Sequence, residues 1–306
     1  MLSIQPIFPS WRRRWWRPDA EALQTFAGLR PVAVVTGGSE GIGLAFARAL
    51  VRAGAEILLV ARDQARLAEA ATAIAHEFPG SAIATLALDL TTPDALATFD
   101  RTLAGMRAYA DILVNNAGIG LGGPFVGQAP ADIDALLALN VAALTRLCRH
   151  VLPGQLVRGR GGIINLASIG GYCPAPQQAV YYASKAYVLS FSEALAAETA
   201  GRGIHVLAVA PGPVSTRFHA KISAEHALYR YLLPAQSAEC VVRAAMIGFR
   251  LGLRVVVPGL FNPVLVLALR LLPHRLMLPL MAILMRTTPQ AMSAANKHHD
   301  PSSQSR

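Results

Sequence analysis

Short apolar runs rich in β-branched residues alternate along this chain with longer Ala- and Leu-rich segments. Each run is short and is bounded by turn residues, which is typical of buried strands. A regular alternation of strands and helices predicts a doubly wound parallel α/β sheet of about seven strands, with helices on both faces. The expected strands are 32–36, 56–61, 83–88, 112–115, 163–167, 204–210 and 254–258. The expected helices are 42–53, 64–77, 94–108, 131–153, 179–200 and 236–251.

A glycine-rich turn follows the first expected strand. The sequence TGGSEGIG, residues 36–43, places Gly37, Gly41 and Gly43 between that strand and the next helix. Glycines permit a tight turn and a close approach of the backbone to a pyrophosphate at the helix N-terminus. Because the turn lies between a strand and a helix, as such a site requires, the sequence predicts a dinucleotide-binding loop.

Further motifs follow the glycine turn in order. They are NNAG at 115–118, Asn140 in LALNV, Ser168 in INLAS, Tyr181 and Lys185 in YxxxK, and Pro211, Gly212 and Thr216 in PGPVST. With the Gly-x3-Gly-x-Gly spacing, they resemble the short-chain dehydrogenase/reductase family, in its compact single-domain branch, from residue 32 to about residue 259. The resemblance implies a Rossmann-like fold and an NAD(P)H-dependent enzyme that interconverts a ketone and a secondary alcohol.

The resemblance also implies two sets of site residues. The catalytic residues are expected to be Ser168, Tyr181, Lys185 and Asn140. The cofactor contacts are expected at Gly37, Ser39, Gly41, Ile42, Gly43, Arg62, Asp89, Asn116, Ala117, Gly118, Tyr181, Lys185, Pro211, Gly212, Val214 and Thr216.

The octet VYYASKAY, residues 180–187, raises the question of which tyrosine serves the lysine. On a helix, both Tyr181 and Tyr182 can approach Lys185, because residues three and four apart are neighbours. Geometry therefore leaves two candidates. The family pattern places the tyrosine 13 residues after the serine, which selects Tyr181. We expect Tyr182 and Tyr187 to be packing residues.

Lysine is rare in this chain, with three lysines against 25 arginines, so its use at residue 185 is informative. An ammonium is a compact charge that favours a neighbouring phenolate and can donate to ribose hydroxyls. The planar guanidinium of arginine has a different reach, so the two are not interchangeable here.

The family mechanism gives each catalytic residue a role in this chain. Hydride from the cofactor reduces a ketone carbon, and Tyr181 donates the proton to the oxygen. Ser168 holds and polarises that oxygen, and Lys185 orients the ribose and tunes Tyr181. Asn140 would hold a water that resupplies protons to the catalytic residues. The alternative is that its amide forms hydrogen bonds with backbone groups left unpaired at a kink inside a helix.

The residues after the second strand bear on the choice between NADP(H) and NAD(H). Relatives that prefer NAD carry an acidic residue there for the ribose diol, whereas this chain has Ala61 followed by Arg62, which suits a 2′-phosphate. Glu40 in the glycine turn is an opposing feature, since relatives that prefer NADP often have a basic residue there. Ala61 and Arg62 carry more weight than Glu40, so the sequence favours NADP(H). Asp89 is expected on the adenine side of the cofactor.

The segment after the Pro-Gly motif carries most substrate specificity in this family. Here residues 214–234 are aromatic and aliphatic with few acids, which suits a lipophilic ketone or alcohol; they include Phe218, His219, Tyr229, Tyr231, Leu232 and Leu233. The resemblance makes a 3-keto acyl or sphingoid-type lipid plausible. The alternatives are a hydroxysteroid or other secondary-alcohol dehydrogenase, and a non-catalytic nucleotide-sensing protein on the same fold.

The net charge of +10 belongs to the two ends of the chain. Residues 31–242 hold 15 basic and 15 acidic residues, whereas 1–30 and 243–306 carry the excess. This divides the chain into a basic Trp/Arg-rich arm (1–30), a catalytic domain (31–259) and an apolar, basic extension (260–306). The extension is expected to be either a packing or dimer element of a homo-oligomer or a peripheral contact with anionic lipid.

Several classes of partner and location are disfavoured by the sequence. The neutral body offers no basic face for nucleic acid, and the three cysteines show neither metal spacing nor a pairing pattern. No apolar segment follows the N-terminal arginines as a signal peptide requires, and Arg270, His274 and Arg275 interrupt the most apolar stretch. We expect a cytoplasmic enzyme without a metal, peripheral to the inner face of the membrane if the extension binds lipid.

Overall fold

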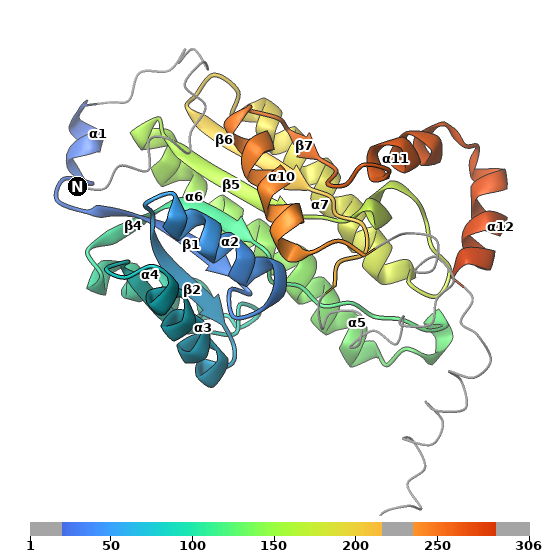
Figure 1. Cartoon of the computed structure of the whole chain (residues 1–306), viewed down its shortest axis with the longest axis horizontal. Helices are drawn as coiled ribbons and strands as arrows, with labels where there is room; N and C mark the ends of the chain where they lie inside the picture. Colours follow the sequence, from blue (N-terminus) through green and yellow to red (C-terminus); the bar gives the residue numbers. More distant parts are fainter. Residues whose placement is uncertain (1–19, 216–234, 286–306) are drawn as a thin grey trace, which may run out of the picture.

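The computed structural model describes residues 20–215 and 235–285 of the chain. Its centre is a seven-stranded sheet in the order β3-β2-β1-β4-β5-β6-β7 (Figure 1), and all neighbouring strands are parallel. The strands are β1 (Arg30–Thr36), β2 (Glu56–Ala61), β3 (Ile83–Ala87), β4 (Ala108–Asn115), β5 (Gly161–Leu166), β6 (Ile204–Val209) and β7 (Val255–Val256). The expected fold class is confirmed.

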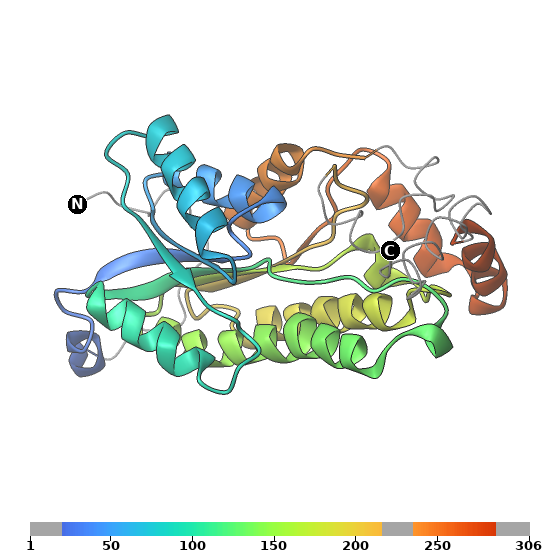
Figure 2. The same cartoon turned by 90° about the horizontal axis from the view of Figure 1, so that it is seen from below.

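Helices cover both faces of the sheet, which gives the three layers visible in Figure 2. One layer consists of α2 (Gly41–Arg52), α3 (Gln64–Glu77) and α10 (Ala238–Arg250). The other consists of α4 (Ala95–Gly105), α6 (Leu144–Arg158) and α7 (Ala179–Glu198). The remaining elements are α1 (Ala20–Gln24), η2 (Phe125–Gly127), α5 (Pro130–Leu137), η3 (Ala138–Ala143), η4 (Ile169–Tyr172), α11 (Asn262–Leu271) and α12 (His274–Leu284).

Successive residues of each strand supply the two cores alternately. In β1, Ala33 and Val35 pack against the layer of α2, whereas Val32 and Val34 pack against the layer of α4. This is the period of two that a strand imposes on its side chains. Because both faces are covered, the strands are continuous apolar runs, and this is why they could be located in the sequence.

The strand order reverses at β1, which pairs with β2 on one side and with β4 on the other. The chain first moves outward to β3 and then returns across β1 to form β4. In an open parallel sheet, ligands bind outside the carboxyl ends of the strands at such a reversal. Thr36 and Asn115, the last residues of β1 and β4, therefore mark the expected place of a ligand.

The helical stretch between β4 and β5 is longer than the expected 131–153. It runs without a break over Pro130–Arg158, and its middle part, η3, is a π-helical turn. Among the described residues, this is the one helix that has the length and composition to cross a membrane. Its second half packs as α6 against β4 and β5 and buries Gln155 and Arg158, so we assign it to the layer that covers the sheet.

Two helices follow the last strand, at the end of the molecule opposite to α1 (Figure 1). Pro273 separates α11 from α12. Pro279 lies inside α12, although a proline in a helix interior is generally expected to break or kink the helix. Pro279 is exposed, and one missing backbone hydrogen bond is tolerated on the exposed side of a short helix.

Candidate active site

The glycine turn connects the end of β1 to the start of α2. Gly37 and Gly41 have φ angles of 62° and 57°, in the left-handed region where glycine is favoured. A Cβ added at Gly43 would collide with the carbonyl oxygen of Gly37 and lie 2.5 Å from Nδ2 of Asn116. Ser39 and Ile42 lie in the same turn and are partly buried.

A second turn, NNAG after β4, is tied to the glycine turn by Thr36. The backbone N–H groups of Asn116 and Ala117 both donate to Oγ1 of Thr36, at 3.0 Å each. Nδ2 of Asn116 donates to the carbonyls of Thr36 and Gly37, at 3.0 and 3.1 Å. The two turns thus form one rigid unit at the reversal point of the sheet. Sequence reasoning missed the role of Thr36, although it is the first residue of the glycine motif.

The geometry of this unit fits a dinucleotide. Glu40 is the N-cap residue of α2, and its side chain makes no capping hydrogen bond to the first turn. The first backbone N–H groups of a helix need partners, and a phosphate group is well suited to provide them. The bare glycine backbone and the N-terminus of α2 would therefore hold the pyrophosphate of a bound NAD(P)(H).

Two residues on the expected adenosine side are electrostatically linked. Asp89 accepts hydrogen bonds from the N–H and Oγ1 of Thr91, at 2.9 and 2.7 Å. These bonds, with a smaller contribution from the charge of Arg62, lower the pKa of Asp89 below its usual value. Arg62 is exposed directly after β2, so it is available to an anionic group there.

Glu40 forms an ion pair at this rim. Its Oε2 lies 3.5 Å from Nη1 of Arg66, and Nε of the same arginine lies 3.3 Å from Oδ2 of Asp63. Both partners of the Glu40–Arg66 pair are more than a third exposed, so the pair contributes little to stability. Its effect on the local charge is the larger consequence. Arg66 is shared between Glu40 and Asp63, so it offsets part of the negative charge of Glu40, the feature that opposed an NADP(H) site.

Lys185 lies on α7, and its side chain is buried. Its Nζ donates to the carbonyl of Leu166 at 2.8 Å and lies 5.8 Å from the ring centroid of Tyr181. Burial lowers the pKa of Lys185 from its usual value to about 8, so the amine is still mostly charged at neutral pH. Gly118 lies beside it, since a Cβ added there would be 3.7 Å from Nζ.

Asn140 lies in the π-helical turn η3 and joins three segments. Its Oδ1 accepts from the N–H of Ile119 at 2.9 Å, and its Nδ2 donates to the carbonyl of Ile119 at 2.8 Å. Nδ2 is also 3.3 Å from Oγ of Ser184, which donates to the carbonyl of Tyr181 at 2.7 Å. Asn140 thus holds the segment after NNAG against the catalytic helix. Its expected role as a water-binding residue stays a prediction.

Ser168 follows β5 and is the N-cap residue of η4. Its Oγ accepts from the N–H of Gly170 at 3.1 Å. A hydroxyl that accepts still carries its own proton, so Ser168 can donate to a substrate oxygen at the same time. The hydrogen bond to Gly170 would hold that hydroxyl in place.

The other two tyrosines of the octet have different surroundings. The ring of Tyr182 lies against Gly170, where an added Cβ would be 3.0 Å away, and its hydroxyl donates to Sδ of Met285 at 3.9 Å. Tyr187 stacks on Phe191, and its hydroxyl is 3.0 Å from Oγ1 of Thr145. Tyr182 therefore connects the catalytic helix to the segment after α12, a contact that sequence reasoning missed.

The Pro-Gly segment lies next to the serine. The N–H of Ile169 donates to the carbonyl of Pro211 at 3.0 Å, and Val214 is buried. A Cβ at Gly212 would be 2.8 Å from Nδ2 of Asn262, at the start of α11. The expected cofactor residue Thr216 lies outside the described residues, as do Phe218, His219, Tyr229, Tyr231, Leu232 and Leu233.

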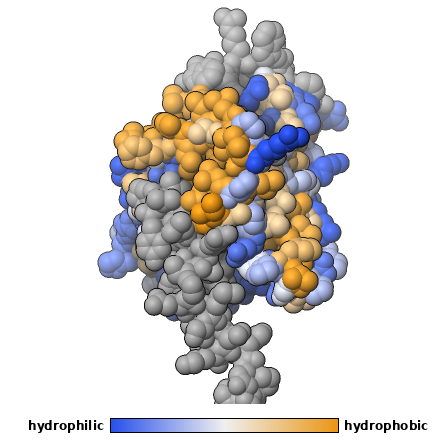
Figure 3. Space-filling model, turned by 90° about the vertical axis from the view of Figure 1, so that its right-hand side faces the viewer, coloured by the Kyte–Doolittle hydropathy of each residue, from blue (hydrophilic) through white to orange (hydrophobic). Residues whose placement is uncertain are grey.

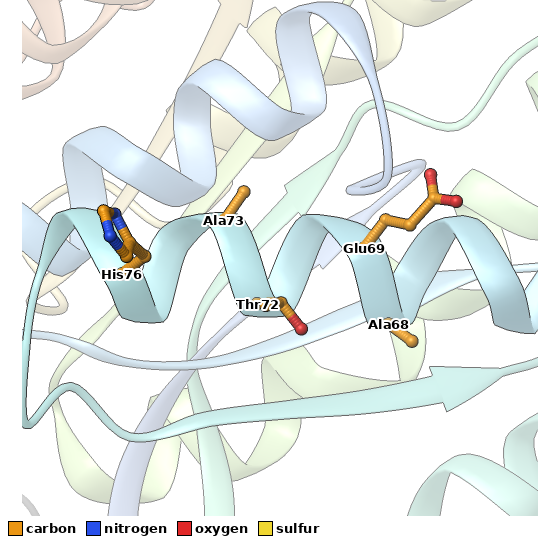
Figure 4. A pocket seen from close by; sticks show the side chains of 5 residues that line it. All are labelled: Ala68, Glu69, Thr72, Ala73 and His76. Carbon is orange, nitrogen blue, oxygen red and sulfur yellow. The ribbon is translucent and has the colours of Figure 1, made fainter.

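A shallow hollow on the surface of α3 has no role in this site. Figure 4 shows its five lining side chains, which come from successive turns of the one helix: Ala68, Glu69, Thr72, Ala73 and His76. All five are exposed and lie away from the catalytic residues. Among the described residues, no group of three or more His, Cys, Asp or Glu side chains could hold a metal ion.

The rate of ketone reduction should fall as the pH rises through about 8, the pKa of Lys185. Below that pH the buried amine is charged, and the charged form is the one that is expected to donate to the ribose and to act on Tyr181. Above it the charge is lost. The measurement is kcat/KM for the ketone across the neutral and alkaline range. A value that stays constant well above this pKa would show that the charge of Lys185 is not required.

Comparison with known proteins agrees with this geometry. Residues 31–227 match the short chain dehydrogenase family. The chain is 34% identical over 218 residues to a very-long-chain 3-oxoacyl-CoA reductase of Bos taurus, a match that covers 70% of this chain and 67% of the bovine protein.

Two solved structures are also similar. A short-chain dehydrogenase from Sphingobium yanoikuyae in complex with NADPH is 36% identical with a TM-score of 0.68, covering 76% of this chain and 89% of that one. A bulky-bulky ketone specific alcohol dehydrogenase from Comamonas testosteroni is 34% identical with a TM-score of 0.66, covering 75% and 86%. The protein therefore belongs to the short-chain dehydrogenase/reductase family and is an oxidoreductase.

Proposed function

We propose that this enzyme uses NADPH to reduce the ketone of a lipophilic substrate, such as a 3-keto acyl lipid. The observation that carries the reaction is the buried Lys185 beside Tyr181, with Ser168 at the end of a nearby strand. A nucleotide-sensing protein would need no proton donor at this place. The intact set of donors beyond the carboxyl end of β5 therefore supports an enzyme.

Each residue has a role that its contacts support. When bound, the cofactor supplies a hydride to the carbonyl carbon. Tyr181 donates its phenolic proton to the carbonyl oxygen, and Ser168 donates a hydrogen bond that polarises the same oxygen. Lys185 uses one N–H on Leu166, which leaves the others for the ribose hydroxyls.

The charges around the glycine turn support NADPH over NADH. Ala61 offers no acceptor for a ribose diol, and the exposed Arg62 suits a 2′-phosphate. Glu40, the one acidic residue in the turn, has Arg66 within 3.5 Å. The similar Sphingobium dehydrogenase was also solved in complex with NADPH.

The surroundings of the serine support an apolar substrate. A small apolar cluster beside η4 joins Cys173 and Ala175 to Leu269 and three methionines of α12 and its end, Met277, Met281 and Met285. Methionine adapts to irregular apolar shapes, which suits a flexible acyl chain. The names of the bovine and Comamonas proteins point to long-chain or bulky ketones, and this proposal extends that class to the present enzyme.

A panel of ketones tests this proposal by the rate of NADPH consumption. We expect kcat/KM to rise with the length of a 3-keto acyl chain, by up to about fourfold per methylene while each added group is buried. Steroid ketones form a second arm of the panel, and the Tyr181→Phe protein serves as the blank. A preference for short polar ketones would contradict the proposed substrate class, and faster turnover of the steroids would favour the hydroxysteroid alternative.

A further inference from the structure

The two helices after the last strand are apolar on both sides. On the inner side, Val266 and Leu269 of α11, with Met277 and Met281 of α12, are buried against the domain. An amphipathic surface helix would carry polar residues on its other side. Here the residues at helical spacing on the other side are also apolar.

We name this second side the outer apolar face. It consists of Val264, Leu267, Leu271, Leu276, Leu280 and Ile283, which are between 43% and 74% exposed. Figure 3 looks onto this end of the molecule and shows a broad apolar area on it. Contiguous exposed apolar surface of this kind usually marks an interaction site.

The charge of this region is of one sign. Residues 240–285 contain five arginines and no aspartate or glutamate. The guanidinium of Arg270 lies 5.0 Å from the ring centroid of Tyr172, at the base of α11, and Arg275 is exposed at the start of α12. The two helices that carry the outer apolar face therefore contain basic residues and no acidic ones.

The inner side of the same helices contacts the sequence neighbours of the expected catalytic residues. α11 packs against η4, which begins one residue after Ser168. Asn262 lies against Gly212, and Met285 accepts a hydrogen bond from Tyr182, the neighbour of Tyr181. Whatever covers the outer apolar face lies one helix layer from the reacting centre.

We propose that the outer apolar face docks on an anionic lipid bilayer, and that a lipophilic ketone passes from the bilayer to the catalytic residues beside α11 and α12. The delivery of substrate rests on the proposed function, whereas the docking itself does not. Apolar side chains enter the boundary between headgroups and acyl chains, and the arginines lie at the level of the anionic headgroups. The cytoplasmic leaflet supplies such lipids.

The charges favour a bilayer over a second copy of the chain. A two-fold symmetric interface brings the same surface of both copies together. Arg270 and Arg275 of one copy would then face the same surface of the other copy, and α11 and α12 contain no acidic residue to pair with them. Anionic headgroups provide the missing negative charge.

A second segment of tryptophans and arginines lies near the N-terminus, at residues 11–17. That segment lies outside the described residues, and α1, the first described helix, is at the opposite end of the molecule (Figure 1). The proposal therefore rests on α11 and α12 alone.

Co-sedimentation of the full chain with vesicles tests the docking, without cofactor or substrate. The vesicles contain phosphatidylcholine with phosphatidylglycerol, and vesicles of phosphatidylcholine alone are the comparison. We expect binding to the anionic vesicles that weakens at high salt without disappearing, since burial of apolar side chains is insensitive to salt. Leu267→Glu, Leu271→Glu and Leu280→Glu together should weaken it by about tenfold or more.

A matched variant controls for the added charge. Leu23→Glu, Ile247→Glu and Leu251→Glu change three exposed apolar residues on α1 and at α10, and this protein should bind the vesicles as the unchanged chain does. Both variants should retain NADPH-dependent turnover of a water-soluble ketone, which shows that they fold. The proposal is overturned if the unchanged chain stays in the supernatant at low salt, or if both variants bind equally.

A second copy as the occupant would give a different pattern. The outer-face variant would then change from dimer to monomer in light scattering, with no vesicle binding by the unchanged chain, and this too overturns the proposal. A ketone panel with no turnover would remove the proposed function but leave the vesicle result standing, so the two failures are distinguishable.

Discussion

The Tyr181→Phe protein should lose ketone reduction by about a hundred- to ten-thousand-fold in kcat, the range typical of a removed general acid. The substitution deletes only the phenolic hydroxyl, so the ring and its position 5.8 Å from Nζ of Lys185 can be retained. Binding of NADPH should change little. The measurements are kcat with a reactive ketone and a fluorescence titration of NADPH.

Tyr182→Phe is the matched control, because it makes the same change one residue along α7. Its hydroxyl donates to Sδ of Met285 at 3.9 Å, a weak bond outside the proposed reaction. We expect kcat within about threefold of the unchanged enzyme, since the lost bond costs well under 1 kcal/mol. If Tyr182→Phe were the inactive protein and Tyr181→Phe the active one, the assignment of the proton donor would be wrong.

Arg62→Ala should weaken binding of NADPH by about ten- to a hundred-fold, the equivalent of one charge-assisted hydrogen bond of about 1.5–3 kcal/mol. Binding of NADH should be little affected, because NADH has no 2′-phosphate. Titration of both cofactors against both proteins measures the difference. An equal loss for NADH would show that Arg62 supports the structure instead of the phosphate.

Glu40 and Arg66 give a control for the same experiment. Arg66→Ala leaves the Glu40 carboxylate without the guanidinium 3.5 Å away, so NADPH should bind more weakly by a few-fold. In a Glu40→Gln background the carboxylate is absent, and Arg66→Ala should then have less effect. When two residues interact in this way, the effects of their substitutions on the binding free energy of NADPH are not additive. Additive losses would mean that Arg66 contacts the cofactor independently of Glu40.

The fold could be predicted from the sequence because a doubly wound sheet produces a regular alternation of apolar runs and helical segments. Strands buried on both faces are continuous apolar runs, and β2 and α3 occur at the expected residues. The start of β4 was predicted less well: it begins at Ala108, whereas the apolar run begins at residue 112. Ala108 and Ala110 are small and carry little strand signal, and they are strand residues because they pair with β1.

The sequence predicted the motifs that form the candidate site, but it did not predict the contacts between their residues. Local sequence shows that Ser168, Tyr181 and Lys185 fall on the right elements. It does not show that Oγ1 of Thr36 joins two turns 80 residues apart, because such a contact exists only once β1 and β4 are adjacent. The same holds for Asn262 at Gly212 and for Met285 at Tyr182. These long-range contacts depend on where α11 and α12 pack.

The central claim is that Tyr181, Ser168 and Lys185 support transfer of hydride from NADPH to a ketone. The most direct measurement is the deuterium content of the alcohol formed from a long-chain ketone with NADPH deuterated at the transferring position. We expect one deuterium on the carbinol carbon with the unchanged enzyme, and about a hundred- to ten-thousand-fold slower formation of labelled alcohol with Tyr181→Phe. Tight binding of NADPH without labelled alcohol from any ketone of the panel would contradict it.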